Sequence, residues 1–240
     1  MISYPNSGQA GFATPAATVL SLAIAMLASA VMALSVASLR YERTEFARLR
    51  AETALEGAQI QAAAFLSGHR ANGPVRWQTN IGRERAEVIA EPETRKLGPS
   101  ASPDLIGSVA RALGSSDPDR IAAVLSALQT SRSTVAPGSI DDLGGSMLWR
   151  RCARSIMSIY GTATDLPNLA FDEPGAASAA GHTAELWRIR ITSETGWVDD
   201  RVVRFTGSAE APLSVAAWSF GRGSPLGLTC QAALARAGAQ

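Results

Sequence analysis

The chain has 240 residues, of which 46% are hydrophobic and 18% charged, and its formal net charge is +1. This balance excludes a disordered chain and a bundle of many membrane helices, and it provides no basic field for nucleic acid. Two cysteines and two histidines are too few for a disulfide scaffold or a zinc ribbon. The length leaves room for a membrane anchor plus one domain, or for two small domains.

The first part of the chain is uncharged. From Met1 to Leu39 it contains no Asp, Glu, Lys or Arg, and Ala16–Leu39 consists only of Ala, Val, Leu, Ile, Met, Ser and Thr. About 20 helical residues cross the roughly 30 Å hydrocarbon core of a bilayer. We therefore expect a membrane-spanning helix. The rival interpretation is a cleaved secretory signal ending at Ala28-Ser29-Ala30, but this segment lacks a charged start and its apolar run continues past that point.

The helical pattern continues beyond the apolar run. Residues 40–66 contain no Pro, and Gly57 is their only Gly. An apolar row recurs at helical spacing, and charges of both signs lie on the other side. The apolar row consists of Leu55, Ala58, Ala62, Phe65 and Leu66. We predict one continuous helix from Ala16 to Ser67, apolar in its first half and amphipathic in its second, ended by Gly68 and Gly73-Pro74.

The sequence after residue 184 alternates with the period of a strand. In Trp187–Thr192 the residues Trp187, Ile189 and Ile191 share one face, and Arg201–Thr206 alternates again after a turn at 194–196. These segments predict an antiparallel hairpin. Residues 215–220 predict a third strand, and residues 87–90 a fourth.

Between the fourth strand and the hairpin, the pattern is helical. Two short helices, Pro103–Leu113 and Pro118–Leu128, each begin with Pro after the capping residues Ser102 and Asp117. Residues 161–183, rich in Gly, Ala, Pro and Asp, indicate a connecting loop. The expected fold class is α+β: a long N-terminal helix packed on a small antiparallel sheet, with an inserted helical subdomain.

The residues that carry chemistry are few. No nucleophile elbow, phosphate-binding loop or dinucleotide fingerprint is present. The four potential zinc ligands lack a local ligand spacing and favour no site; they are His69, His182, Cys152 and Cys230. Weak candidates for calcium are the two acidic pairs Asp141-Asp142 and Asp199-Asp200, for which solvated turns are the simpler interpretation.

The two cysteines and three aromatic residues each leave two interpretations open. In an oxidising compartment Cys152 and Cys230 would form a disulfide, and otherwise they would be buried thiols. Trp149, Trp197 and Tyr160 are candidates either for interface anchors or for core residues.

The N-terminus resembles a prepilin-type signal. A short polar leader ends at Gly11, Phe12 follows, and the apolar helix comes next. Type IV pilins and type II secretion pseudopilins are cleaved at such a junction by a membrane prepilin peptidase, and the new N-terminal Phe is methylated. Most members carry Glu five residues after the cut, where this chain has Ala16. The K-type minor pseudopilins characteristically lack that Glu.

Further segments resemble the K-type family in the same order along the chain. Residues 87–103 are similar to its strand and Gly-Lys-Leu-Asp-Leu-Asn pattern: Glu93, Lys96 and Leu97 match, but Arg95 stands where Gly is usual and Ser100 where Asn is usual. Residues 139–160 keep the spacing of the family's Glu-Leu, Gly, Leu-Trp-x-Arg-Leu and Thr-Val-Tyr sequence. Residues 186–220 resemble its closing hairpin and terminal Trp strand. The matching positions in 139–160 are Asp142-Leu143, Leu148-Trp149, Arg151 and Ile159-Tyr160.

The resemblance implies an organisation and a function. The implied function is that of a non-enzymatic subunit at the tip of the type II secretion pseudopilus, which assists export of folded proteins across the outer membrane. Its implied partners are other minor pseudopilins, prepilin peptidase and inner-membrane lipid, with no nucleic acid and no cofactor, although some K-type relatives bind calcium. The implied parts are a leader at 1–11, a transmembrane helix at 12–39, its amphipathic continuation at 40–69, a pilin-like sheet at 70–96 and 184–222, a helical subdomain with its loop at 97–183 and a tail at 223–240.

Location and function each leave alternatives. The resemblance implies an inner-membrane protein with a periplasmic C-terminal domain. By the positive-inside rule alone that domain would be cytoplasmic, because four arginines within 40–50 follow the apolar run and no basic residue precedes it. The alternatives for function are a membrane-anchored binding or enzymatic domain and a type IV pilus minor pilin.

Overall fold

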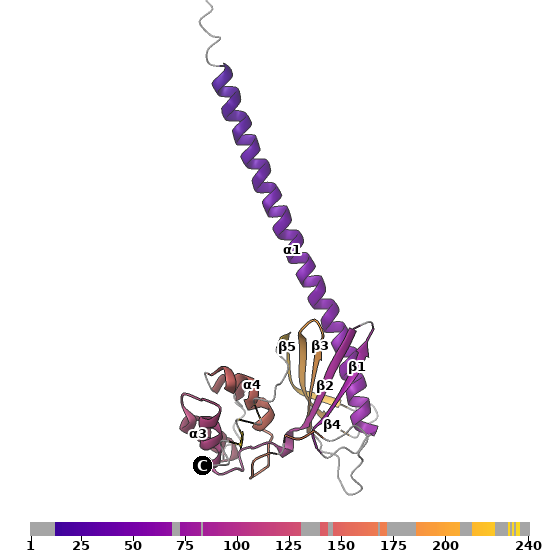
Figure 1. Ribbon diagram of the computed structural model, residues 1–240, viewed down its shortest axis with the longest axis vertical. Coiled ribbons are helices and arrows are strands. Elements are labelled where there is room, and N and C mark those ends of the chain that lie inside the picture. Colours follow the sequence, from indigo (N-terminus) through magenta and orange to yellow (C-terminus); the bar gives the residue numbers. More distant parts are fainter. Residues whose placement is uncertain are drawn as a thin grey trace, which may run out of the picture. The chain divides into compact units, whose positions relative to one another are not determined.

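The computed structural model describes most of the chain, and Figure 1 shows its elements. The described residues are 13–68, 73–82, 84–130, 140–143, 146–167, 169–171, 186–206, 213–223, 230, 232 and 234–235. They form two compact units, Met1–Ala51 and Glu52–Gln240. The α+β class is confirmed, since the elements are helices and one antiparallel sheet.

The helices and strands have the following bounds. The helices are α1 (Ala13–Gly68), α2 (Pro103–Ala112), α3 (Pro118–Thr130) and α4 (Met147–Ile156). The strands are β1 (Val75–Ile81), β2 (Glu84–Pro92), β3 (Leu186–Ser193), β4 (Trp197–Phe205) and β5 (Leu213–Arg222). The long helix therefore agrees with its prediction to within a few residues at each end.

The sheet is a meander in which every strand pairs with its sequence neighbours. Its order is β1-β2-β3-β4-β5, and all pairs are antiparallel. The chain leaves this order once, between β2 and β3, where α2, α3 and α4 are inserted. An inserted helical subdomain was predicted from the composition of this segment, whereas β1 was missed.

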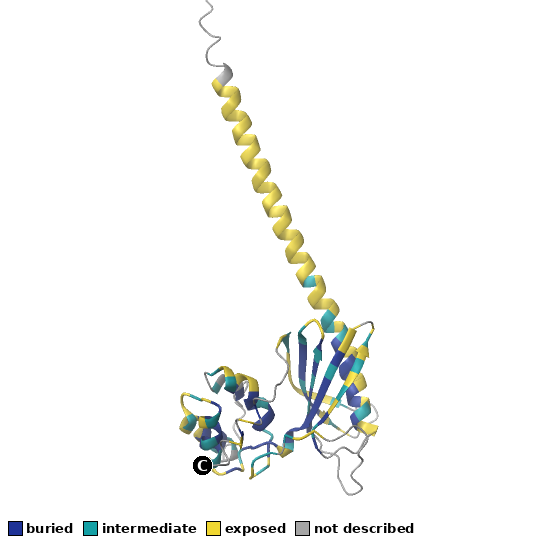
Figure 2. Cartoon of the chain, viewed as in Figure 1, coloured by how far each residue is buried: buried dark blue, intermediate teal, exposed yellow. Residues whose placement is uncertain are grey.

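The second part of α1 packs on one face of the sheet. Its buried residues include Leu55, Ala58 and Ala62, which meet the row Val88, Ile189 and Ile191. Figure 2 shows the change along α1 from exposed to buried. The predicted alternation is confirmed, because Trp187, Ile189 and Ile191 share this core.

The helical subdomain has a core of its own. Its members come from α2, α3 and α4, from Leu97, Ala101 and Ile140, and from the C-terminal part of the chain. The predicted N-caps are present: the Ser102 side chain accepts from the Leu105 N–H at 3.2 Å, and Asp117 Oδ1 accepts from the Arg120 N–H at 3.1 Å. Capping satisfies backbone donors that the first helical turn leaves unpaired. The second unit therefore contains two cores with a boundary between them.

Candidate functional site

The first candidate functional surface is the apolar part of α1. Its large hydrophobic side chains from Val19 to Leu39 are 47–72% exposed, and none of its described residues is buried. By length and composition this helix could span a membrane. An exposed apolar surface of this extent needs lipid or protein around it. Gly11 and Phe12, the predicted processing junction, lie outside the described residues.

A buried ion network lies at the boundary between the two cores. Glu93, which is fully buried, is at its centre in a short 3-10 turn, Glu93–Arg95, directly after β2. Its Oε1 accepts from Lys96 Nζ at 2.6 Å and from Arg188 Nε at 2.9 Å, and its Oε2 accepts from the Ser158 hydroxyl. Lys96, only 2% exposed, also pairs with Glu91 at 2.8 Å. Three segments of the chain therefore meet at the Glu93 carboxylate: the turn after β2, the strand β3 and the segment after α4.

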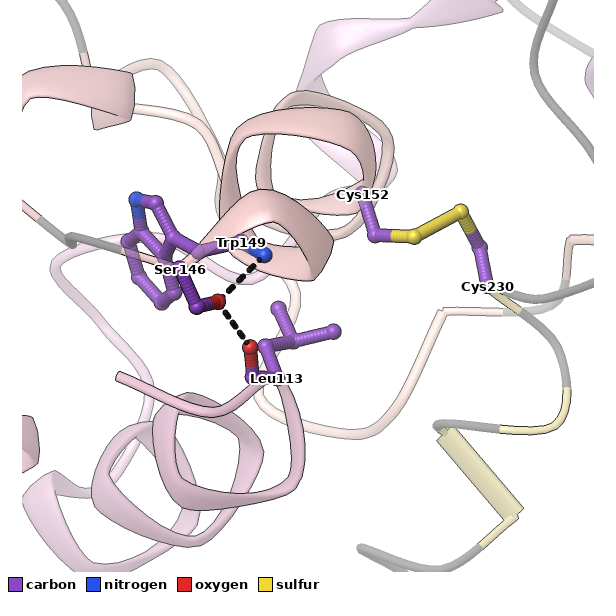
Figure 3. Close-up of a disulfide and its surroundings, with 5 residues drawn as sticks. All are labelled: Leu113, Ser146, Trp149, Cys152 and Cys230. Carbon is purple, nitrogen blue, oxygen red and sulfur yellow. Dashed lines mark hydrogen bonds between the residues drawn. A yellow bond between two sulfur atoms is a disulfide. The ribbon is translucent and has the colours of Figure 1, made fainter. Parts of the chain in front are cut away.

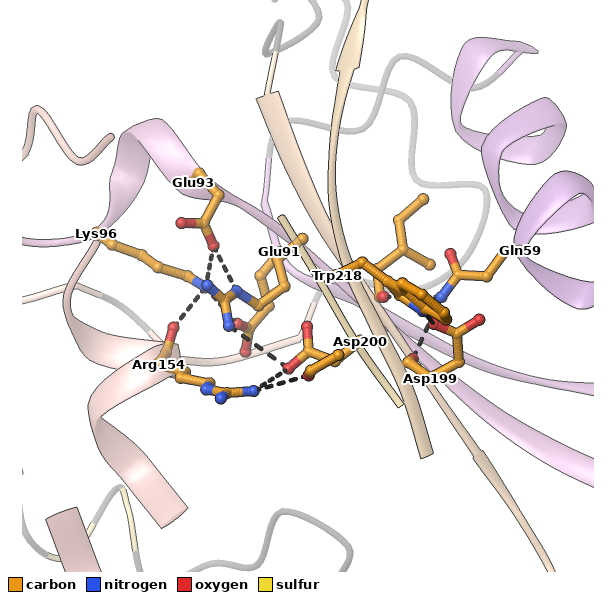
Figure 4. A network of polar contacts seen from close by, with 11 residues as sticks. Gln59, Glu91, Glu93, Lys96, Arg154, Asp199, Asp200 and Trp218 are labelled. Atoms are coloured by element: carbon orange, nitrogen blue, oxygen red, sulfur yellow. Dashed lines mark hydrogen bonds and ion pairs between the residues drawn. The ribbon is translucent and has the colours of Figure 1, made fainter. Parts of the chain in front are cut away.

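The network extends from the sheet to the helical subdomain through Arg154 of α4. Lys96 Nζ donates to the Arg154 carbonyl oxygen at 2.7 Å. The Arg154 guanidinium donates to Asp200 Oδ2 on β4 at 3.1 Å and to Ser219 Oγ on β5 at 3.2 Å. Figure 4 shows these contacts beside the sheet, on the side away from Gln59 of α1. Buried charges need such complete pairing to be tolerated.

Charge pairing outweighs burial in the titration of Glu93 and Arg188. Burial alone would raise the pKa of Glu93, but the charges of Lys96 and Arg188 and its hydrogen bonds lower that pKa from 4.5 to about 2. Burial likewise opposes the charge of Arg188, but Glu93 and Asp200 raise its pKa above the ordinary value. Both side chains therefore stay ionised at neutral pH. Strongly perturbed groups occur at functional sites and in structural networks alike. We assign a structural role to the pairing of Glu93 with Lys96 and Arg188, because these contacts join the sheet to the helical subdomain.

The backbone around this network is also closely packed. The Leu97 N–H donates to the Ile156 carbonyl at 2.9 Å, and the Leu97 carbonyl accepts from the Ser158 N–H at 2.8 Å. A Cβ atom on Gly161 would lie 2.3 Å from the Lys96 carbonyl oxygen, so this approach requires glycine. Glu93, Lys96 and Leu97 are the three residues that carried the sequence resemblance in this segment, and their role here is to join the two cores.

The structure pairs Cys152 with Cys230, as Figure 3 shows. The bond joins α4 to the C-terminal part of the chain across 78 residues. Both thiols are therefore in the disulfide, and neither can bind zinc as a thiolate. His69 and His182 lie outside the described residues.

Trp149 is a core residue. It is fully buried, and its indole N–H donates to the Ile140 carbonyl at 3.1 Å. Ser146 caps α4: its Oγ accepts from the Trp149 N–H at 2.9 Å and donates to the Leu113 carbonyl at 2.7 Å (Figure 3). Trp197 is half-buried and stacks on Phe220 at 5.2 Å, and Tyr160 is half-buried. The interface interpretation is therefore wrong for Trp149.

The structure gives Asp199 and Asp200, the weak calcium candidates, partners on opposite faces of the sheet. Both residues lie inside β4, where successive side chains point to opposite faces. Asp199 pairs with Arg201 and accepts from the Trp218 indole N–H at 3.0 Å, whereas Asp200 pairs with Arg154 and Arg188. Two carboxylates on opposite faces cannot share one cation. The side chains of Asp141 and Asp142 lie outside the described part of the chain, within which no group of three or more His, Cys, Asp or Glu is placed to hold a metal.

A groove of about 300 Å³ opens beside the network. Residues 157–160 form one wall, and β4 and β5 form the floor. Arg154, Asp200 and Ser219 lie at its polar part, and Ile140, Met157 and Val202 line its apolar part. This groove could not be predicted from the sequence, because its two sides come from segments far apart in the chain.

Comparison with known proteins gives no further identification. No family model matches the chain, and neither a curated protein nor a solved structure is significantly similar to it. The assignment of function therefore rests on the residues and geometry described above.

Proposed function

We propose that this chain is a K-type minor pseudopilin, a non-enzymatic subunit at the tip of a bacterial type II secretion pseudopilus. Its work is physical: the apolar part of α1 holds the subunit in the inner membrane and then packs against the helices of other minor pseudopilins. The prepilin peptidase would first cut between Gly11 and Phe12. The assembled tip would assist export of folded proteins across the outer membrane.

The observation that carries the proposal is the division of α1 into two parts. An apolar part with exposed side chains continues into a part that packs on an antiparallel meander. A helix that served only as a tether would need no such continuation. A pilin-like subunit needs both parts of the helix, because the apolar part contacts neighbouring subunits and the part packed on the sheet carries the globular domain.

The inserted helical subdomain supports the K-type assignment within this class. It lies between β2 and β3, and the matching residues Glu93, Lys96 and Leu97 lie at its junction with the sheet. A bulky insert fits poorly within a repeating shaft, and Ala16 leaves no carboxylate for contact with the N-terminus of a subunit above. Both features favour a position at the tip.

The disulfide supports a periplasmic location. Disulfides persist in oxidising compartments such as the bacterial periplasm and are rare in the cytosol. The positive-inside rule favours the opposite orientation, because it counts the arginines that follow the span. We give the disulfide more weight because it concerns the compartment in which the domain folds.

The proposal can be tested by photo-crosslinking in cells that are exporting protein. A photoreactive residue replaces Leu27, which is 71% exposed, and in a matched control it replaces Leu55, which is 1% exposed. We expect position 27 to form adducts with proteins that carry prepilin-type leaders, identified by mass spectrometry, and position 55 to form only intramolecular products. Adducts of position 27 with lipid alone would contradict an assembly role. Deletion of the chain should also leave exported proteins in the periplasm.

A further inference from the structure

The helix α1 changes from uncharged to charged at residue 40. Its residues from 13 to 39 contain no Asp, Glu, Lys or Arg, whereas the stretch 40–50 contains four arginines and two glutamates. All four arginines are exposed, and Figure 2 shows α1 exposed along most of this stretch. They are Arg40, Arg43, Arg48 and Arg50, and they belong to the first compact unit, Met1–Ala51. The charged surface therefore begins directly where the apolar surface ends.

None of these four arginines makes an ion pair with another residue that the structure describes. Helical spacing explains this for the first two. Arg40 and Arg43 are three residues apart and share one side of α1, whereas Glu42 and Glu45 share another side. Neither arginine has an acidic residue three or four positions away, where a side chain on the same helix could reach it. One side of α1 therefore presents two adjacent positive charges to its surroundings.

The distance of Arg40 and Arg43 from the apolar part gives their depth in a membrane. With a span that ends at Leu39, the helical rise places them about 2 and 6 Å beyond the hydrocarbon core. The headgroup layer of one leaflet is about 5–8 Å thick, since a core of about 30 Å lies within a bilayer of about 40–45 Å. Both arginines are therefore at the depth of the lipid phosphates. Arg48 and Arg50, about 14 and 17 Å beyond the core, lie past that layer.

The chemistry of these side chains matches an anionic headgroup. A guanidinium stays charged and donates two parallel hydrogen bonds to phosphate oxygens. Tyr41, which is 67% exposed, lies in the same turn, and tyrosine is enriched at this depth because its ring is apolar and its hydroxyl is polar. Within the headgroup layer two arginines stand against one glutamate, Glu42, so one positive charge is in surplus. A headgroup with a net negative charge balances this surplus, whereas a zwitterionic headgroup does not.

We propose that Arg40 and Arg43, together with Tyr41, bind the headgroups of anionic phospholipids at the point where α1 leaves the bilayer. This inference rests on the membrane anchor of the proposed function and adds the class of lipid that the anchor selects. The contacts would hold the unassembled subunit at one depth in the membrane. Moving α1 out of the bilayer would break them, so anionic lipid favours the membrane-held subunit over the assembled one.

The first test measures the lipid preference of the full chain in phosphatidylcholine vesicles by electron paramagnetic resonance. The probe is a trace of spin-labelled phosphatidylglycerol or spin-labelled phosphatidylcholine, and the motionally restricted fraction gives their relative affinity for the protein. We expect a preference of about five-fold for phosphatidylglycerol at about 0.15 M salt, the effect of one surplus charge at a membrane surface. At about 1 M salt, where the Debye length falls to about 3 Å, the preference should disappear. Equal affinity for the two lipids at the lower salt concentration would overturn the proposal.

The second test uses two double variants that separate headgroup contact from overall charge. Arg40→Gln with Arg43→Gln removes both charges at headgroup depth and should abolish the preference for phosphatidylglycerol. Arg48→Gln with Arg50→Gln is the matched control, because it removes the same charge from exposed positions farther along the same helix. Each double variant changes the net charge from +1 to −1, since two arginines are lost. The control should keep most of the preference, and an equal loss in both variants would contradict the assigned contact.

The same vesicles distinguish a failure of this inference from a failure of the proposed function. Extraction with alkaline carbonate removes proteins that do not cross the bilayer and leaves those that do. A chain that stays in the vesicles but shows no lipid preference would overturn this inference and leave the pseudopilin assignment standing. A chain that carbonate removes has no membrane span, which would overturn both.

Discussion

The two parts of α1 have similar apolar residues but different surroundings. Leu34 is 72% exposed and Leu55 is 1% exposed, although both are leucines in the same continuous helix. Around Leu55 the chain supplies its own cover, the sheet face of Val88, Ile189 and Ile191. In the apolar part no described residue covers Leu34, and by length and composition this part could span a membrane. Hydrophobicity alone therefore does not distinguish a helix segment that the chain covers itself from one that it leaves exposed.

The largest expected effect comes from the same substitution in both parts. Leu55→Asp buries an unpaired charge against the sheet and should destabilise the second unit by about 3–5 kcal/mol. Leu34→Asp should leave the urea midpoint of that unit unchanged but reduce membrane insertion by about 2.5–3.5 kcal/mol. Urea unfolding in detergent and membrane fractionation measure the two effects. If both variants shift the midpoint equally, the division of α1 is wrong.

The second prediction concerns the boundary between the two cores. Glu93→Gln leaves Lys96 and Arg188 buried with one carboxylate fewer, and it should cost about 3–5 kcal/mol of folding free energy. Urea unfolding of the full chain at neutral pH measures this cost, with Glu42→Gln, an exposed position of α1, as the control. A midpoint equal to that of the control would show that the network does not join the cores.

The same residue makes stability depend on pH. The folded pKa of Glu93, about 2, lies below its ordinary value of 4.5. Its ionised form therefore stabilises the fold above pH 4.5, and this stability is lost as the pH falls from 4.5 toward 2. Burial raises the pKa of Asp199 despite its contact with Arg201, so that group acts in the opposite direction. A pH series of unfolding should be steeper for the wild type than for Glu93→Gln in this window, and parallel curves would contradict the assignment.

A smaller effect is expected from the disulfide. Replacing both Cys152 and Cys230 with Ser should cost about 2–4 kcal/mol, because a closed loop restricts the unfolded chain. Strong reductant should lower the wild-type midpoint to that of the double variant. If reductant leaves the urea midpoint of the wild type unchanged and the double variant is equally stable, the disulfide does not support the helical core.

The smallest expected effect tests the polar contact between α1 and the sheet. Gln59 donates to the Ile189 and Asp199 carbonyls at 3.1 and 3.2 Å. Gln59→Leu should cost about 1 kcal/mol, since the loss of two hydrogen bonds is offset by apolar burial. Gln61→Leu, at a more exposed position of α1, is the control. A cost as large as that of Leu55→Asp would mean that polar contact, rather than apolar packing, holds α1 on the sheet.

Local signals in the sequence predicted much of the fold. The apolar run and its amphipathic continuation predicted α1, and Ser102 and Asp117 marked the starts of α2 and α3. Alternation predicted the β3-β4 hairpin. These features depend on neighbouring residues, which is why the sequence could reveal them.

The errors arose where distant segments decide the outcome. The β4 strand was expected to begin at Arg201, which left Asp199 and Asp200 in a turn, but β4 begins at Trp197 and separates them onto opposite faces. The sequence showed Glu93 and Lys96 as charged residues, whose burial depends on Arg188 and Ser158 far along the chain. The missed strand β1 had a usable signal, since Val75, Trp77 and Ile81 alternate beside the turn at Gly82.

The most direct test of the central claim is the N-terminal mass of the membrane-extracted protein, measured with and without the host's prepilin peptidase. The account predicts a mature chain that begins at methylated Phe12 only when the peptidase is present, so that the apolar part of α1 becomes the N-terminus of the subunit. An intact Met1 in both strains, or a cut after Ala30, would contradict the assignment as a pseudopilin.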